Sequence, residues 1–199
     1  DAGSVAEFAK YSNVPVINAG DGPNQHPTQA LLDIHMIKYE KQRLNKLKIG
    51  FIGDLKHSRT VYSLLDLLKF YADNEIYLIA PSGLELGEAK QSTLEENNVK
   101  IINTNNLAEV IEELDILYVT RIQKERFVEK SDLAKFSKSY VICKESLKNA
   151  KDDLVIMHPL PRIDEIDEDV DELPQAKYFS QAKRGVYLRM ALLDLMLNN

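Results

Sequence analysis

The sequence predicts an α/β fold in which a parallel, Rossmann-like sheet carries helices on both faces. Short apolar runs alternate along the chain with segments of helical periodicity, a pattern typical of parallel sheets. Most of these runs are apolar throughout, as expected of strands that are covered on both faces. The predicted strands are residues 48–53, 75–80, 99–103, 115–120 and 154–157.

A strand-like run at residues 14–18 comes before the first predicted helix. Gly20, Gly22 and Pro23 then interrupt regular structure. A helix is expected to begin at His26-Pro27, because proline is tolerated at the first helical position.

Three further helices are predicted between the strands, at residues 61–71, 87–97 and 107–114. Residues 186–199 are predicted to form a closing helix that is apolar on almost every side, which predicts burial between two bodies. The run at residues 14–18 likewise needs a sheet to join.

Candidate site residues follow the ends of three predicted strands: Arg59, Arg121 and residues 160–162. Ligands of open parallel sheets bind outside the carboxyl ends of the strands, so these residues are expected to meet at one edge. His26 and Gln29 open a helix, where free N–H groups and the dipole favour anions and developing oxyanions. The two side chains share one helix face and would polarise a carbonyl.

Four motifs resemble, in order, those of the aspartate/ornithine carbamoyltransferase family, and the likeness covers essentially the whole chain. They are HPTQ at residues 26–29, GDLKHSRT at 53–60, TRIQKER at 120–126 and HPLPRIDEI at 158–166. The resemblance is closer to the aspartate-specific members. It implies that carbamoyl phosphate and L-aspartate give N-carbamoyl-L-aspartate and phosphate in pyrimidine biosynthesis, with no cofactor and no metal.

The resemblance also implies how L-aspartate would be held. Arg59 would bind its α-carboxylate, and Arg121 together with Gln123 would bind its β-carboxylate. Arginine suits both tasks because its planar fork binds a carboxylate bidentately. We interpret Glu125 as the residue that orients Arg121.

The carbamoyl group would be held by the other candidates. His26 would stabilise the tetrahedral oxyanion, and Gln29 would hold the carbamoyl amide. Leu160 and Pro161 would present backbone carbonyls to the carbamoyl NH₂ and the attacking amine. The bond between them is expected to be cis, and His158 is expected to be structural.

By the same resemblance the chain divides into four parts. Residues 1–25 would end a carbamoyl-phosphate domain, 26–44 would form the interdomain helix, 45–185 the aspartate-binding domain, and 186–199 a helix packing back on the N-terminal domain. The family's Ser-Thr-Arg-Thr phosphate motif is absent, so this chain is expected to lack full activity alone. A homotrimer of catalytic chains is implied, with a zinc-binding regulatory chain in some members.

Composition and hydropathy exclude some classes of binding partner and some cellular locations. The chain of 199 residues has a net charge of −6, which argues against nucleic acid as a partner. No apolar stretch reaches the roughly 18 residues of a membrane span and no signal peptide is visible, so a cytoplasmic location is expected. Cys143, the single cysteine, excludes a disulfide framework and is expected to be buried. The acidic residues 164–172 do not have the spacing of a calcium loop.

Two other functions stay open at this point. An ornithine carbamoyltransferase is the nearest, although a second arginine would repel the cationic end of ornithine. That branch of the family also typically has cysteine where this chain has Pro159. The other is a non-catalytic regulatory or scaffold domain of the same fold, against which the four intact motifs count.

Overall fold

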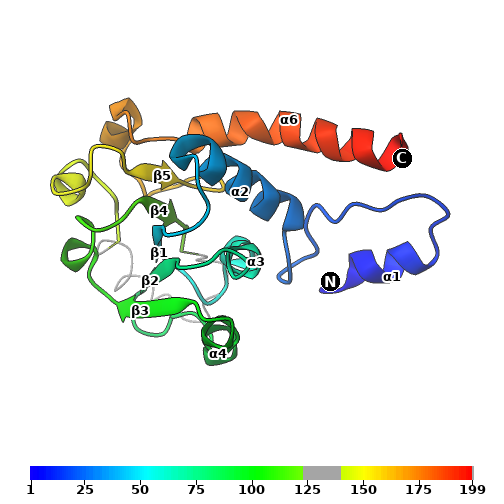
Figure 1. The fold of residues 1–199 in the computed structure, drawn as a ribbon, viewed down its shortest axis with the longest axis horizontal. Coiled ribbons are helices and arrows are strands. Elements are labelled where there is room, and N and C mark those ends of the chain that lie inside the picture. The colour runs from blue at the N-terminus through cyan, green and yellow to red at the C-terminus, as the bar shows by residue number, and fades with distance from the viewer. Residues whose placement is uncertain (123–139, 199) are drawn as a thin grey trace.

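The computed structural model describes residues 1–122 and 140–198. Its strands form one sheet in the order β3-β2-β1-β4-β5, and every neighbouring pair is parallel (Figure 1). The strands are β1 (Lys48–Ile52), β2 (Glu75–Ile79), β3 (Lys100–Thr104), β4 (Ile116–Val119) and β5 (Val155–Met157). The predicted α/β fold is confirmed, and each predicted strand matches an observed one to within about a residue or two at its ends.

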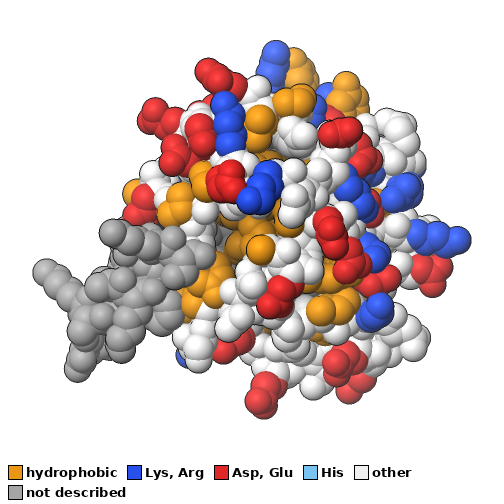
Figure 2. Space-filling view, turned by 90° about the vertical axis from the view of Figure 1, so that its left-hand side faces the viewer, with side chains coloured by type: hydrophobic (Ala, Val, Ile, Leu, Met, Phe, Trp, Pro, Cys, Tyr) orange, Lys and Arg blue, Asp and Glu red, His pale blue; other side chains and the backbone are white. Residues whose placement is uncertain are grey.

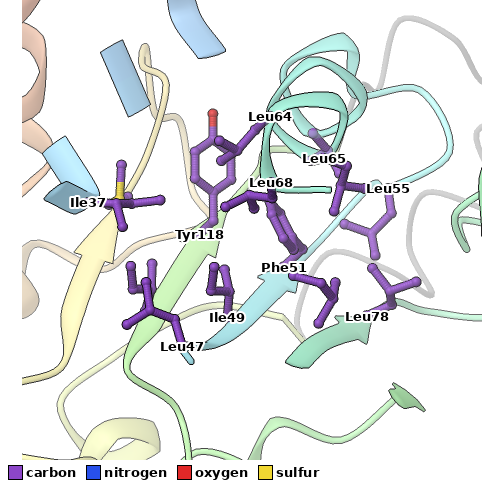
Figure 3. Close-up of a cluster of buried hydrophobic side chains, with 14 of the residues drawn as sticks. Ile37, Leu47, Ile49, Phe51, Leu55, Leu64, Leu65, Leu68, Leu78 and Tyr118 are labelled. Atoms are coloured by element: carbon purple, nitrogen blue, oxygen red, sulfur yellow. The ribbon is translucent and has the colours of Figure 1, made fainter. Parts of the chain in front are cut away.

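Three α-helices pack on one face of the sheet: α2 (Pro27–Lys41), α3 (Arg59–Leu68) and α4 (Glu88–Glu96). Their apolar side chains form a single buried cluster with the strands beneath them (Figure 3). Leu64 and Leu68 of α3 lie beside the aromatic pair of Phe51 and Tyr118, whose ring centroids are 5.5 Å apart. Because α2 and α3 pack on this face through the same buried cluster, their positions relative to the sheet are fixed.

Short 3₁₀ segments, together with the start of α6, cover the other face within the described residues. They are η1 (Leu107–Glu109), η3 (Glu145–Leu147) and η4 (Glu168–Glu172). The long helix α6 (Tyr178–Leu197) contributes the buried ring of Tyr178 and then runs alongside α2 (Figure 1). A Cβ added to Gly185 would lie 3.2 Å from the side chain of Leu32, so the two helices approach closely there.

Three predicted elements differ from the structure. Residues 107–114 form η1 and turns, because the β-branched Val110 leaves helical geometry with a φ of −128°. Residues 14–18 form no strand, since Pro15 lacks an N–H and none of the described strands lies beside them. The closing helix begins at Tyr178 rather than at residue 186, because burial of Tyr178 extends it over the sheet.

The two ends of the chain project from the same side of the sheet (Figure 1). Helix α1 (Ser4–Lys10) leaves Phe8 exposed, and α6 leaves Tyr187, Met190 and Leu193 exposed, so the expected burial of α6 is not provided by the described residues. The opposite side of the molecule carries acidic and basic side chains that are interspersed (Figure 2). Among the described helices, none combines the length and hydropathy needed to span a bilayer.

Candidate active site

One cavity of about 360 Å³ opens at the carboxyl ends of the central strands. The predicted residues His26, Gln29, Arg59, Arg121, Leu160 and Pro161 all line it. The same loops supply its other lining residues, which are Gly22, His57, Ser58, Thr60, Thr120, His158 and Pro159. The cavity therefore lies at the strand ends where these residues were predicted to meet. Gln123 and Glu125, predicted to act beside Arg121, lie outside the described residues.

Gly53 brings the ends of β1 and β4 together beneath this cavity. Its φ is +119°, and a Cβ added to it would lie 2.2 Å from the carbonyl oxygen of Thr120. Glycine alone fits this backbone contact. The contact places the loop that leads to Arg59 directly beside the residue that precedes Arg121, which explains how both arginines reach one cavity.

Two helix N-termini also face the cavity. His26 is the N-cap of α2 and Ser58 is the N-cap of α3, and neither makes a side-chain capping bond. The backbone N–H of His26 donates to Ser63 Oγ at 2.9 Å, which ties the two helix starts together. Uncapped N–H groups and the helix dipoles create a positive potential that favours anions.

The imidazole of His26 is held neutral. Burial, together with the positive charges of Arg59 and Arg189, lowers its pKa to about 4. Its Nδ1 is buried without a hydrogen-bond partner. At neutral pH the ring can therefore donate one N–H to a ligand oxygen, and it does not act as a cation.

This low pKa predicts how stability changes with pH. Between pH about 6.5 and about 4 the unfolded chain binds a proton at His26 that the folded chain does not bind. The contribution to the free energy of unfolding is present above pH 6.5 and is lost as the pH falls to about 4. Urea unfolding across this range should therefore show a shallower pH slope for His26→Asn, with exposed His35 →Asn as the matched control. An NMR titration midpoint of His26 near 6.5 would contradict the prediction.

The two arginines come from separate segments of the chain. Arg59 is the first residue of α3, and its Nη1 donates to the carbonyl oxygen of Gly22 at 2.7 Å. Arg121 follows Thr120, whose N–H donates to the carbonyl oxygen of Ile52 at 2.9 Å. Two arginines that line one cavity suit a ligand that carries two separated carboxylates.

The segment after β5 is rigidly shaped, and the Leu160-Pro161 bond is cis as predicted. The backbone N–H of Leu160 donates to Nδ1 of His158 at 2.8 Å, and His158 Nε2 lies 2.6 Å from Glu165 Oε1. His158 is buried, and both of its ring nitrogens are engaged within the protein. These contacts agree with the structural role predicted for His158.

The sequence reasoning missed a buried cluster behind the cavity. Asp33 accepts hydrogen bonds from Gln29, Gln181 and Tyr118, and burial raises the pKa of its carboxyl to about 7. A signal for Asp33 existed, since it lies four residues after Gln29 on an otherwise apolar helix face. No local pattern indicated Gln181.

Two weaker sequence signals, Cys143 and His57, can be placed in the structure. Cys143 was expected to be buried and is only partly buried, and its backbone N–H bonds to Ser146. His57 Nδ1 lies 3.0 Å from Asp54 Oδ1 at the cavity rim. Within residues 1–122 and 140–198, no three His, Cys, Asp or Glu side chains are grouped closely enough to hold a metal ion.

Comparison with family models identifies two matching segments. Residues 45–196 match the model described as "Aspartate/ornithine carbamoyltransferase, Asp/Orn binding domain". Residues 1–39 match the model described as "Aspartate/ornithine carbamoyltransferase, carbamoyl-P binding domain".

Individual relatives agree with both family models. The chain is 50% identical over 199 residues to an aspartate carbamoyltransferase catalytic subunit of Alkaliphilus oremlandii, covering 100% of this chain and 60% of that protein. It is 50% identical over 195 residues to the corresponding subunit of Thermococcus onnurineus, covering 98% and 63%. The chain thus spans about 60% of the length of these relatives.

Solved structures show the same likeness. The catalytic subunit of M. jannaschii aspartate transcarbamoylase superposes with a TM-score of 0.93 at 45% identity, covering 100% of this chain and 64% of that one. Aspartate transcarbamoylase from Trypanosoma cruzi in complex with carbamoyl phosphate and aspartate superposes with a TM-score of 0.87 at 36% identity, covering 96% and 61%.

Proposed function

Because the chain belongs to the aspartate/ornithine carbamoyltransferase family, we propose that it is the aspartate-binding part of an aspartate carbamoyltransferase. The reaction is transfer of the carbamoyl group of carbamoyl phosphate to the amine of L-aspartate. The observation that carries this proposal is the cavity in which Arg59 and Arg121 stand beside the neutral His26.

In this proposal the two arginines select a dicarboxylate. Arg59 binds the α-carboxylate of aspartate, while Arg121, with Gln123, binds the β-carboxylate. The hydrogen bond from Arg59 to Gly22 reduces the side-chain entropy that is lost when the ligand binds. Glu125 is proposed to orient Arg121 in the same way.

The carbamoyl group is held by the opposite side of the cavity. His26 donates a hydrogen bond to the carbonyl oxygen, which stabilises the tetrahedral oxyanion, and such donors typically contribute about 3 kcal/mol. Gln29 holds the carbamoyl amide, and the backbone carbonyls of Leu160 and Pro161 face the NH₂ group and the attacking amine. The amine nitrogen bonds to the carbamoyl carbon, the carbon–oxygen bond to phosphate breaks, and phosphate accepts the amine proton.

We also propose that α6 packs against a further protein surface. The exposed side chains of Val186, Tyr187, Met190 and Leu193 support this, because large apolar side chains gathered on one helix favour burial. We propose the same division of the chain that the family resemblance implies. Residues 26–44 join residues 1–25, the end of a carbamoyl-phosphate domain, to an aspartate-binding unit of residues 45–185. A homotrimer, a zinc-binding regulatory chain in the assembly and a cytoplasmic location are proposed from the family alone.

The proposal is tested with the protein purified as the cell makes it. Radiolabelled carbamoyl phosphate should yield carbamoyl-aspartate with L-aspartate, and no detectable product with L-ornithine, whose cationic end would face Arg121. Faster product formation with ornithine would establish the ornithine-type activity instead. No product with either amino acid, while both still bind, would establish a non-catalytic domain.

A further inference from the structure

Asp33 lies at the centre of a buried cluster behind the cavity. Its Oδ1 accepts hydrogen bonds from Gln29 Nε2 at 2.8 Å and from Gln181 Nε2 at 2.6 Å. Its Oδ2 accepts a hydrogen bond from the hydroxyl of Tyr118 at 2.9 Å. None of the four side chains belongs to a residue that is more than 6% exposed, and they come from α2, β4 and α6.

The bond to Asp33 decides which end of the Gln29 amide faces the cavity. A glutamine side chain carries an accepting oxygen on one side and a donating NH₂ on the other. Because Gln29 gives its NH₂ to Asp33, its Oε1 is the atom left for the cavity that it lines. An oxygen there can accept a hydrogen bond from a carbamoyl NH₂ group. A reversed Gln29 amide would instead place its own NH₂ group against the NH₂ group of the ligand.

The same oxygen of Asp33 also fixes Gln181. With its NH₂ donated to Asp33, Gln181 uses its Oε1 to accept the backbone N–H of His158 at 2.9 Å. His158 begins the segment that carries Leu160, and its Nδ1 accepts the N–H of Leu160 at 2.8 Å. One carboxylate oxygen thus sets both the amide on α2 and the segment after β5.

The orientation of the two glutamine amides is the same in both protonation states of Asp33. A proton on Oδ2 would be donated to the hydroxyl oxygen of Tyr118, and Oδ1 would still accept both glutamine amides. Asparagine at position 33 offers the same groups, an oxygen toward the glutamines and an NH₂ toward Tyr118. The geometry therefore depends on an accepting oxygen and not on the charge.

We propose that Asp33 is a positioning residue that orients Gln29 and, through Gln181, the segment 158–161 for recognition of the carbamoyl NH₂. The inference rests on the proposed function, because it assigns a carbamoyl ligand to the cavity. It extends that function by one residue that does not itself touch the ligand.

The test is a double-mutant cycle on the protein purified as the cell makes it, with the Kd of carbamoyl phosphate measured by calorimetry. Gln29→Ala and Asp33→Ala should each raise the Kd by about tenfold, the typical worth of one oriented hydrogen bond. The double variant should bind more tightly than two independent losses would give, because part of the effect of Asp33 passes through Gln29 and the rest through Gln181. If Asp33→Ala raises the Kd by the same factor in the Gln29→Ala variant as in the parent, the proposal is overturned, because the effect is then a general structural disturbance that does not pass through Gln29.

Two further variants keep the test decisive. Asp33→Asn should keep the Kd within about threefold, because the accepting oxygen is retained, and a large loss in this folded variant would overturn the proposal. Asp115→Ala is the matched control, since it removes a buried carboxylate that accepts from Lys48 N–H and Lys151 at the amino end of β4. A parent protein that does not bind carbamoyl phosphate would refute the proposed function, whereas unchanged binding by Asp33→Ala refutes this inference alone.

Discussion

Arg121→Ala is expected to abolish most dicarboxylate binding while leaving the fold intact. The side chain lines the cavity directly after β4, outside the two buried clusters, so its loss leaves the sheet in place. Removal of one partner from a desolvated, charge-assisted pair costs roughly 2–5 kcal/mol. The Kd of succinate, measured with carbamoyl phosphate at saturation, should therefore rise by at least about 30-fold.

Arg43→Ala is the matched control for this substitution. Arg43 is also an arginine near a strand end, but it lies 3.5 Å from Asp115 at the opposite edge of the sheet. Its removal should leave succinate binding unchanged. Arg121→Lys should recover only part of the affinity, because lysine lacks the bidentate fork. If Arg121→Ala binds succinate as tightly as the parent does, the assignment of the β-carboxylate is wrong.

Gly53→Ala is expected to weaken both the fold and the binding of ligands. The added methyl group would lie 2.2 Å from the carbonyl oxygen of Thr120, so β1 and β4 must separate at their carboxyl ends. Overpacking of this kind typically costs about 1–3 kcal/mol. The same displacement moves Arg121 relative to Arg59, so urea unfolding and succinate titration should both show a loss.

Gly83→Ala separates the steric effect from backbone strain. Gly83 also has a positive φ, of +93°, but nothing lies within 4 Å of a Cβ added there. This control should cost only the strain of the left-handed conformation, about 1 kcal/mol, and should not alter ligand binding. Equal losses from both substitutions would show that contact with Thr120 contributes nothing.

The predictable features of this molecule are those that depend on residues close together in the sequence. The apolar runs predicted the strands, and His26-Pro27 predicted the start of α2 at Pro27. The rule that ligands bind at the carboxyl ends of parallel strands predicted that Arg59 and Arg121 lie at one edge of the sheet. The helix predicted at residues 107–114 was wrong, because the same helical periodicity also suits a turn that inserts Val110 and Ile111 into the core.

Contacts between distant parts of the chain could not be predicted in this way. Asp33 and Gln181 are separated by 148 positions, and only the packing of α6 along α2 brings them together. The effect of Arg189 on the pKa of His26 depends on the same packing. Gly53 was visible as a strand end, yet its close contact with Thr120 is a property of the assembled sheet.

The uncapped starts of α2 and α3 and the two arginines concentrate positive potential inside a chain whose net charge is −6. A dianionic ligand therefore meets repulsion at long range and attraction only within the cavity. The screening length is about 10 Å at 0.1 M salt, so added salt first removes the long-range term. Association should consequently become faster as ionic strength rises, while dissociation also becomes faster because the arginine–carboxylate pairs weaken. Ionic strength would thus set the rate of ligand exchange more strongly than it sets the affinity.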